Sequence, residues 1–217
     1  MKVLLATRSV GKEREIRRLL QEVRGLRLSV PAAEGLEATE EEEGVEAFET
    51  FEENAAAKAL HFYRRSGLPT LADDSGLVVD ALSGAPGVRS KRFAPGGESR
   101  SGLEQDHANN EHLLERLGDL ELAQRSARFV CVAVLCMSPS DLRVFRGEAE
   151  GLILGMARGE GGFGYDPLFY DPTLGKSFAE LLPDEKNLRS HRGKAFHQVA
   201  EAMEHVVSDG EGGHGSD

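Results

Sequence analysis

The chain has 217 residues, of which 40% are hydrophobic and 29% charged. These values are typical of a globular protein with a buried core, and they exclude wholesale disorder. The length fits one domain, or one domain with a small second lobe. The longest apolar run, Phe129 to Met137, is too short for a membrane helix, and no signal-peptide core follows Met1. We therefore expect a cytoplasmic protein that does not bind membranes.

The net charge of −11 is concentrated in two places. Ten glutamates lie from Glu34 to Glu53 with no Lys or Arg among them, and three acids lie in residues 208–217, which we predict to be a disordered tail. The rest of the chain is close to neutral. No stripe of basic residues with interleaved aromatics is present, which argues against nucleic acid as a partner. A small anionic ligand held by a few cations is compatible with this charge.

Hydrophobic periodicity and turn residues predict the elements of the first half. The segment that carries most of the glutamates is expected to be a solvated loop, and a capping box is expected to start the second helix. In chain order the predicted elements are a strand at 2–6, a helix whose apolar face runs from Ile16 to Val23, an acidic loop at 36–45, a helix from Thr50 to about Ser66, and extended segments at 70–72 and 77–79 that meet at a polar kink.

The second half is predicted to hold a turn at 82–88, a helix at about 103–117, strands at 129–137 and 142–150, a glycine-rich loop at 159–164 and a last helix from near Ser190. The strand at 129–137 is apolar on both faces, so it should lie inside a sheet. Its two cysteines, Cys131 and Cys136, face opposite sides of the strand and are expected to stay reduced. The pattern predicts an α/β (mixed α+β) fold over residues 1–207, built on a mixed sheet.

A first candidate site is the loop Thr7-Arg8-Ser9-Val10-Gly11-Lys12, which lies between the predicted first strand and first helix. Backbone N–H groups and the positive end of a helix dipole favour a phosphate at such a place, and Lys12 adds a charge. The loop is not a Walker A motif, because its first glycine is missing and Glu13 replaces the Ser or Thr that holds the metal. An ordinary connecting loop with an exposed lysine is the alternative.

The second candidate is Asp73-Asp74, flanked by apolar segments and without any Lys or Arg from Leu68 through Val88. Adjacent carboxylates raise each other's pKa unless a cation relieves them. A divalent metal is one such cation, and Mg²⁺ is typically held by one or two carboxylates, water and substrate phosphates. A solvated acidic turn is one alternative. The triplet Asp74-Ser75-Gly76 also matches aspartic proteases, but those enzymes need two copies, and Asp73 is foreign to their pattern.

Two further segments suggest nucleotide recognition. The loop Gly161-Gly162-Phe163-Gly164-Tyr165-Asp166 offers two aromatic rings and an acid, which suits a stacked base as well as a structural turn. Lys186 and Ser190-His191-Arg192 lie at the predicted start of the last helix, where the helix dipole disfavours cations. An anionic or carbonyl-bearing ligand would explain that placement, and a solvent-facing basic turn is the alternative.

Six motifs in register resemble the inosine/xanthosine triphosphate pyrophosphatases of the Ham1 family, over Lys2 to about Val207. The motifs are Leu5-Ala6-Thr7 with Gly11-Lys12, Phe51-Glu52-Glu53-Asn54-Ala55, Ala72-Asp73-Asp74-Ser75-Gly76-Leu77, Gly84-Ala85-Pro86-Gly87, Gly162-Phe163-Gly164-Tyr165-Asp166-Pro167 and Ser190-His191-Arg192-Gly193. The resemblance implies a Mg²⁺-dependent nucleoside triphosphate pyrophosphohydrolase that removes ITP, dITP and XTP from the nucleotide pool. It also implies an elongated two-lobed fold with the active cleft between the lobes, and a homodimer.

The resemblance also assigns roles to residues. It implies that Asp74 is the general base, that Glu53 and Asp74 bind Mg²⁺, and that His191 and Arg192 read the base. The triphosphate is assigned to Thr7, Arg8, Ser9, Val10, Gly11, Lys12 and Lys186, and further nucleotide contacts to Ser75, Phe163, Gly164, Tyr165 and Asp166.

Two positions depart from the family's pattern. The family usually has Asn at the place of Ser9, and often Gly at the place of Arg8, so Arg8 either contacts a phosphate or points to solvent. Two alternatives to the function stay open: a nucleotide sensor without turnover, and a pyrophosphatase of modified pyrimidine nucleotides. The clustered acids disfavour the sensor, and the Ser-His-Arg-Gly and Phe-Gly-Tyr-Asp segments disfavour the pyrimidine enzyme.

Overall fold

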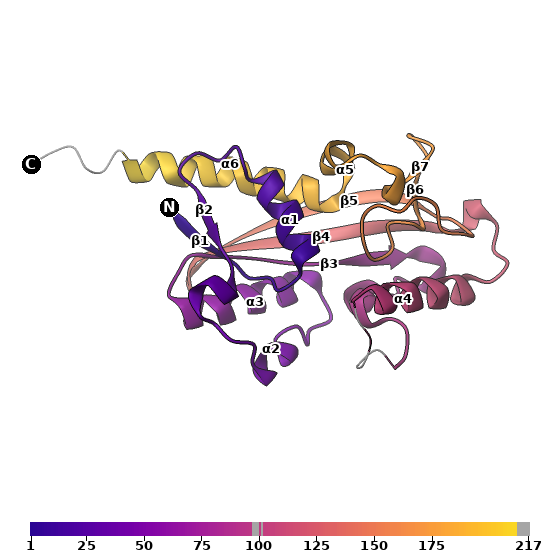
Figure 1. Ribbon diagram of the computed structural model, residues 1–217, viewed down its shortest axis with the longest axis horizontal. Helices are drawn as coiled ribbons and strands as arrows, with labels where there is room; N and C mark the ends of the chain where they lie inside the picture. Colours follow the sequence, from indigo (N-terminus) through magenta and orange to yellow (C-terminus); the bar gives the residue numbers. More distant parts are fainter. Residues whose placement is uncertain (97–99, 101, 212–217) are drawn as a thin grey trace, which may run out of the picture. The chain divides into compact units, whose positions relative to one another are not determined.

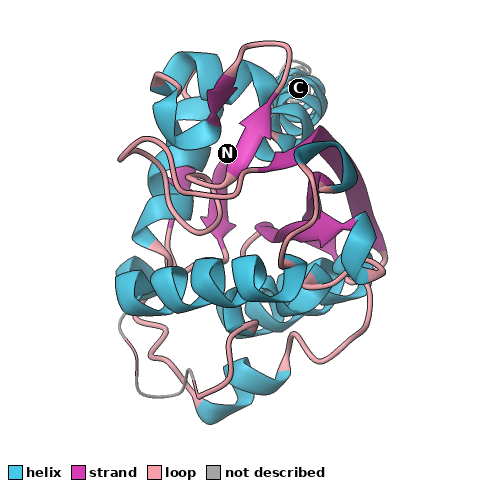
Figure 2. Ribbon diagram, turned by 90° about the vertical axis from the view of Figure 1, so that its right-hand side faces the viewer, coloured by secondary structure: helices cyan, strands magenta, loops and turns pink. Residues whose placement is uncertain are grey.

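The structure is a computed structural model that describes residues 1–96, 100 and 102–211. Helices and strands are mixed along the chain, as the sequence predicts for an α/β protein (Figures 1 and 2). The elements are β1 (Lys2–Leu5), α1 (Val10–Leu19), β2 (Arg27–Ser29), α2 (Glu40–Gly44), α3 (Phe51–Ser66), β3 (Thr70–Val79), α4 (Gly102–Leu117), β4 (Ser126–Ser138), β5 (Asp141–Ile153), β6 (Phe169–Asp171), β7 (Lys176–Ser177), α5 (Pro183–Arg189) and α6 (His191–Glu211).

The strands form one mixed seven-stranded sheet in the order β2-β1-β3-β4-β5-β6-β7. β1 is parallel to both β2 and β3, whereas β6 is antiparallel to β5 and β7. β4 is the fourth strand, and a run of eight consecutive residues in it is buried. The prediction that this apolar strand lies inside the sheet is therefore confirmed. Cys131 and Cys136 on β4 are buried free thiols, which is also as predicted.

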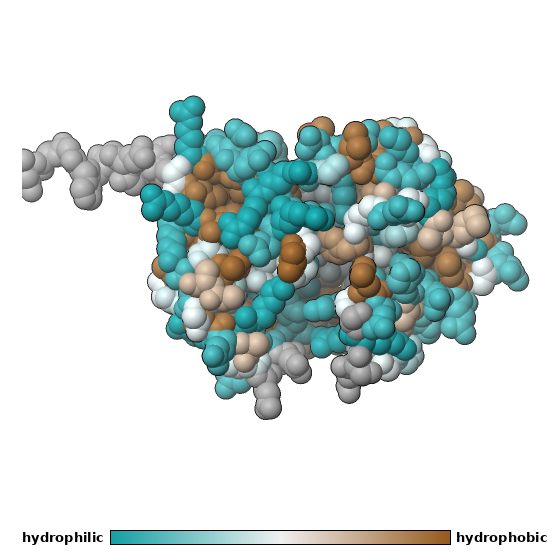
Figure 3. Space-filling view, in the orientation of Figure 1, coloured by the Kyte–Doolittle hydropathy of each residue, from teal (hydrophilic) through white to brown (hydrophobic). Residues whose placement is uncertain are grey.

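The chain divides into two compact units. Unit 1 consists of Met1–Asp74, Cys131–Gly147 and the residues from Arg192 onward, and unit 2 of Ser75–Val130 and Glu148–His191. Among the described residues, no helix is long and apolar enough to cross a membrane. The face of the molecule seen in Figure 3 is mostly hydrophilic, with its apolar residues in small patches.

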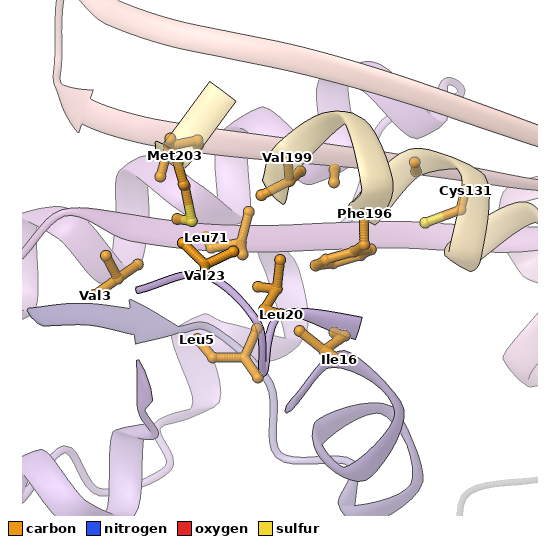
Figure 4. Close-up of a cluster of buried hydrophobic side chains, with 13 residues drawn as sticks. Val3, Leu5, Ile16, Leu20, Val23, Leu71, Cys131, Phe196, Val199 and Met203 are labelled. Atoms are coloured by element: carbon orange, nitrogen blue, oxygen red, sulfur yellow. The ribbon is translucent and has the colours of Figure 1, made fainter. Parts of the chain in front are cut away.

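The core of unit 1 lies between its strands and the helices α1 and α6 (Figure 4). Alternation along β1 turns Val3 and Leu5 toward these helices and Leu4 toward the opposite face, where α3 lies (Figure 1). α1 contributes Ile16, and α6 contributes one stripe of side chains spaced three or four residues apart. The buried side chains of that stripe are Phe196, Val199 and Met203.

The core of unit 2 is aromatic. Phe169 contacts Phe129 at 4.5 Å and Phe178 at 4.7 Å between ring centroids. α4 adds Leu113 and Leu117 to this cluster, so the predicted helix at 103–117 is present and packs on the strands. Large rings in contact bury much apolar area per residue, which stabilises this core.

The predicted polar kink at residues 73–76 is wrong, because β3 runs without interruption from Thr70 to Val79. The predicted loop at 36–45 is also partly wrong. It contains the short helix α2, and Glu42 on that helix forms ion pairs with Arg8 and Arg65. In both places, ion pairs with residues far away in the sequence hold acidic residues in regular structure.

Two helix ends predicted from the sequence have different outcomes. The predicted helix start at Thr50 is confirmed, because Thr50 Oγ1 accepts a hydrogen bond from the Glu53 backbone N–H, whereas the Glu53 carboxylate accepts from the Thr50 hydroxyl. At the end of the last helix, α6 continues to Glu211, so residues 208–211 are helical where a disordered tail is predicted. The buried apolar stripe of α6 stabilises the helix, and because helix formation is cooperative, the helix continues beyond the stripe. Residues 212–217 of the predicted tail lie outside the described part of the chain.

Replacing Phe196 with Ala should lower the free energy of unfolding by about 3–5 kcal/mol, because the ring is fully buried between α6 and the sheet. Urea denaturation followed by circular dichroism measures the loss. His197→Ala, at the exposed neighbouring position, is the control and should change stability by less than about 0.5 kcal/mol. A loss below about 1 kcal/mol in Phe196→Ala would contradict the packing described above.

Candidate active site

The segment from Thr7 to Lys12 joins β1 to α1, and its last three residues, from Val10 to Lys12, form the first turn of the helix. Ser9 caps α1, because its hydroxyl accepts a hydrogen bond from the Lys12 backbone N–H at 3.4 Å, and its own N–H donates to Thr7 Oγ1. Val10 is 80% exposed at the first turn of the helix. The loop therefore presents the N-terminus of a helix, a place where backbone N–H groups attract anions.

Lys12 extends from the first turn of α1 to Asp73 on β3. Its Nζ lies 3.0 Å from Asp73 Oδ2, and Arg192 Nη2 lies 3.5 Å from the same oxygen. Asp73 is 1% exposed. Burial alone would raise its pKa, but the charges of Lys12 and Arg192 hold the pKa well below its usual range. Asp73 is thus an ionised, buried carboxylate, and the cations that the sequence lacks between residues 68 and 88 come from α1 and α6.

Asp74, the next residue of β3, is in a different electrostatic environment. Burial raises its pKa to about 6, against the charges of Lys12 and Lys58, and the charge of Glu46 adds to the rise. The side-chain amide of Asn54 donates to Asp74 Oδ2 at 3.1 Å and orients the carboxyl. A carboxyl with a pKa close to neutral exchanges a proton readily at physiological pH, which is the property of a general base.

Glu46 and Lys58 belong to this cluster, and sequence reasoning missed both. They form an ion pair, and the charges of both act on Asp73 and Asp74. One signal for Lys58 was available, because it follows Asn54 by four residues and therefore shares a face of α3 with it. Nothing in the sequence separates Glu46 from the other nine glutamates of the acidic stretch.

Glu53, the glutamate that the resemblance assigns to Mg²⁺, has its carboxylate at the start of α3. The side chain is exposed, and its Oε2 accepts a hydrogen bond from the Thr50 hydroxyl at 2.7 Å. Glu46, by contrast, is a glutamate whose charge acts on Asp74. Within residues 1–96, 100 and 102–211, no three His, Cys, Asp or Glu side chains come together as a complete metal site.

In unit 2, the loop from Phe163 to Asp166 is organised around the carboxylate of Asp166. Asp166 Oδ2 accepts hydrogen bonds from the Phe163 backbone N–H at 2.8 Å and from Lys186 Nζ at 2.7 Å. Both Asp166 and Lys186 are buried, and Lys186 Nζ lies 5.0 Å from the centre of the Phe163 ring. Gly162 has φ +75°, and a Cβ there would lie 2.1 Å from Asp166 Oδ2, so this position needs glycine.

Two side chains of α4 also hold this loop. Asp106 accepts a hydrogen bond from the Gly164 backbone N–H at 2.8 Å, and Asn110 donates to the Gly164 carbonyl at 3.0 Å. These two residues are one helical turn apart, so a single face of α4 fixes both polar groups of one glycine. Tyr165 points into the core and donates its hydroxyl to the Ser90 carbonyl, so its ring is part of the structural core. Ser75 is half-buried on β3.

His191 and Arg192 begin α6, as predicted, and both are buried. The ring of His191 stacks on Phe129 at 4.6 Å between centroids. Arg192 Nη1 lies 2.6 Å from Glu15 Oε2, and although burial lowers its pKa, the charges of Asp73 and Glu15 raise the pKa above its usual range. Acidic side chains of unit 1 thus balance the cation that the dipole of α6 disfavours.

The structure therefore brings Lys12, Asp73, Asp74 and Arg192 together in unit 1, and Phe163, Gly164, Asp166 and Lys186 together in unit 2. In the cluster of unit 1, a carboxyl with a near-neutral pKa lies beside a carboxylate that is held ionised. Two aspartates with such different environments are typical of a site where one group moves a proton and the other does not.

Comparison with known proteins gives concordant matches. The model of the Ham1 family matches residues 3–202. A dITP/XTP pyrophosphatase of Thermus thermophilus is 46% identical over 202 residues, which cover 93% of this chain and 91% of that protein. The dITP/XTP pyrophosphatase of Frankia alni is 43% identical over 208 residues, 96% of this chain and 100% of that protein.

Solved structures agree with the sequence matches. A HAM1 protein from Coxiella burnetii is similar with a TM-score of 0.81 at 36% identity, over 96% of this chain and 99% of that one. The Ham1 protein of Staphylococcus aureus has a TM-score of 0.78 at 33% identity, over 95% of this chain and 100% of that one.

Replacing Arg192 with Met should lower the free energy of unfolding by about 3–5 kcal/mol, because Asp73 would keep its buried charge with one cation fewer. Thermal and urea denaturation measure this loss. Arg143→Met is the matched control. Arg143 also pairs with an aspartate, Asp141, but both side chains are more than 40% exposed, so the loss should stay below about 1 kcal/mol. Equal losses in the two variants would show that the buried pair has no special weight.

Proposed function

The chain belongs to the Ham1 family, and we propose that it hydrolyses ITP, dITP and XTP to the nucleoside monophosphate and pyrophosphate. The relatives named dITP/XTP pyrophosphatase match more than nine tenths of both chains. The observation that carries the proposal is the pair Asp73-Asp74, in which burial raises the pKa of Asp74 to about 6 while Lys12 and Arg192 keep Asp73 ionised. This pair supplies a base next to fixed cations.

Asp74 is the general base in this proposal. A base acts best when its pKa lies near the working pH, because it is then largely deprotonated and still accepts a proton from water. Asn54 holds Oδ2 by its hydrogen bond, so the carboxyl is oriented before a substrate arrives. Lys12 and the N–H groups at the start of α1 bind phosphate oxygens and stabilise the charge that develops on the pyrophosphate.

The donor chemistry of the Asp74 cluster suits Mg²⁺. Asp73 is paired with Lys12 and Arg192, which leaves the carboxylate oxygens of Asp74 and Glu46, and Mg²⁺ takes one or two carboxylates with water and substrate phosphates. Two carboxylates are fewer than a complete protein cage, which agrees with the observation that the described residues form none. Bound there, Mg²⁺ would neutralise phosphate charge and orient the leaving group. We propose Glu46 as the partner of Asp74 in place of Glu53, since Glu53 is exposed and its carboxylate accepts a hydrogen bond from the Thr50 hydroxyl.

Recognition of the nucleotide is assigned to Ser75, to the loop from Phe163 to Asp166 and to Lys186, with His191 and Arg192 reading the base. Hydrogen-bond donors aimed at a purine 6-oxo group accept hypoxanthine and xanthine. The 6-amino group of adenine leaves the same donors without partners, a mismatch that costs a factor of about 10⁴. The Lys186–Asp166 ion pair supports this role, because it holds the loop and its phenylalanine in a fixed position.

Incubation of the purified protein with MgCl₂ and ITP, dITP, XTP, GTP, ATP or dUTP tests the proposal. Pyrophosphate should form from ITP, dITP and XTP, with ATP slower by a factor of about 10⁴. Asp74→Asn should lower kcat by about 10²–10⁴-fold while circular dichroism stays unchanged. Orthophosphate as the product would move the cleaved bond, and binding of ITP without turnover would favour a sensor. Turnover of dUTP alone would favour the pyrimidine enzyme, and full activity of a folded Asp74→Asn variant would remove Asp74 as the base.

Glu46→Gln and Glu53→Gln separate the two candidate metal ligands. Glu46→Gln should raise the Mg²⁺ concentration for half-maximal rate by about tenfold or more, because it removes a charged ligand. Glu53→Gln keeps an oxygen for the Thr50 hydroxyl and should change that concentration by less than about twofold. A large effect of Glu53→Gln with none of Glu46→Gln would restore Glu53 as the ligand. Mg²⁺ titrations of the initial rate provide both values.

Two other expectations from the resemblance stay predictions. They are the homodimer and the cytoplasmic location. The oligomeric state is measured by sedimentation of the full chain. The two-lobed cleft likewise stays a prediction, and the division into two compact units is the related feature that the structure contains.

A further inference from the structure

Arg8, at the position where the chain departs from the family's usual glycine, binds the acidic segment. Its Nε lies 2.7 Å from Glu42 Oε2 and its Nη2 lies 2.7 Å from Glu42 Oε1, which is a bidentate pair. Nη2 also donates to the carbonyl of Leu36 at 3.1 Å. The side chain therefore has defined partners within the protein, whereas the sequence offered only a phosphate contact or a solvent-facing position.

A second arginine holds the same segment from α3. Arg65 Nη1 donates to Glu42 Oε1, and Arg65 Nη2 donates to the Glu37 carbonyl at 2.8 Å. Glu42 thus lies between two arginines, and hydrogen bonding to Arg8 in particular lowers its pKa. Arg8 lies shortly after β1, and Arg65 lies in the last turn of α3. Both arginines are therefore attached to elements with buried side chains.

The acidic segment has little to hold it in place by itself. α2 has five residues, and the Thr39 side chain makes no capping hydrogen bond to it. A helix of this length is not stable in isolation. Side chains elsewhere in the protein must therefore stabilise α2, and Arg8 and Arg65 do so through Glu42. At the far end, Asn54 accepts from the Phe48 N–H at 2.9 Å and donates to the Phe48 carbonyl at 3.2 Å.

Glu46 lies inside the segment that these contacts hold. It follows Glu42 by four residues and precedes Phe48 by two. Its ion pair with Lys58 on α3 depends on where the backbone between Glu42 and Phe48 lies. Two anchors on either side of a short stretch fix that position, as supporting contacts fix the ligands of other metal sites.

We propose that Arg8, Glu42 and Arg65 are positioning residues that hold residues 36–48 so that Glu46 reaches Asp74. The expected effect on Mg²⁺ binding rests on the proposed function. The expected effect on the position of residues 36–48 rests on the contacts alone. Partly exposed ion pairs are individually weak, so their loss should loosen the segment without unfolding the protein.

Hydrogen exchange tests the structural half of the inference. In Glu42→Gln, amides of residues 36–48 should exchange about five- to tenfold faster, while those of β1 and α3 stay unchanged. Arg65→Gln is the second variant and should have the same effect. Glu37→Gln is the matched control, because it removes the same charge from the same segment but leaves the Glu37 carbonyl that Arg65 uses. Unchanged exchange in both variants would overturn the proposal.

A double-mutant cycle tests the functional half. Glu42→Gln should raise the Mg²⁺ concentration for half-maximal hydrolysis of ITP about five- to tenfold. In the Glu46→Gln background, Glu42→Gln should have no further effect, since it acts through Glu46. Additive effects, or faster exchange with an unchanged Mg²⁺ requirement, would contradict the positioning role. If the wild-type protein hydrolyses none of the nucleotides, the proposed function fails, and the exchange experiment still decides whether the arginines hold the segment.

Discussion

The ionised carboxylate of Asp73 joins three distant parts of unit 1. It lies on β3, and its partners come from the first turn of α1 and the first turn of α6. Moving a carboxylate out of water costs on the order of several kcal/mol, unless cations and hydrogen bonds compensate for the lost hydration. Lys12 and Arg192 provide that compensation, and Glu15 in turn balances Arg192. The position of each group therefore depends on the others, which explains why a helix begins with a buried arginine where its dipole disfavours one.

The chemistry of Asp74 follows from the same constraint. Successive residues of a strand point to opposite sides, so Asp73 and Asp74 face different environments although they are neighbours. Lys12 and Arg192 form ion pairs with Asp73 and lower its pKa, whereas burial and the charge of Glu46 raise the pKa of Asp74. An uninterrupted β3 is needed for this separation, since a turn at these residues would expose both carboxyls to the same solvent. The fold thus creates one proton acceptor from two identical side chains.

In unit 2, a buried carboxylate likewise holds parts of the chain together. Asp166 pairs with Lys186 and also accepts the Phe163 backbone N–H, while α4 fixes the two polar groups of Gly164. A loop held at so many points loses little conformational freedom when it binds a ligand. In unit 1, the arginines around Glu42 hold residues 36–48 in a comparable way. Recognition and metal binding would then both depend on supporting contacts within the protein, made by α4 in unit 2 and by the arginines around Glu42 in unit 1.

The sequence by itself determined the mixed α/β fold, the buried central strand and the segment that joins β1 to α1, and it predicted a site at Asp73-Asp74, Lys12 and Phe163 to Asp166. Hydrophobic periodicity, capping residues and motifs are properties of the local sequence, so these features can be predicted without knowing the tertiary contacts. Tertiary structure alone decided that β3 continues through the aspartates, that Arg8 binds Glu42, and that the charge of Glu46 acts on Asp74. The physical reason is that the charge on a carboxyl depends on cations brought near by folding. Lys12 and Arg192 are far from Asp73 in the sequence, and the choice among ten glutamates depends on where two arginines place the backbone.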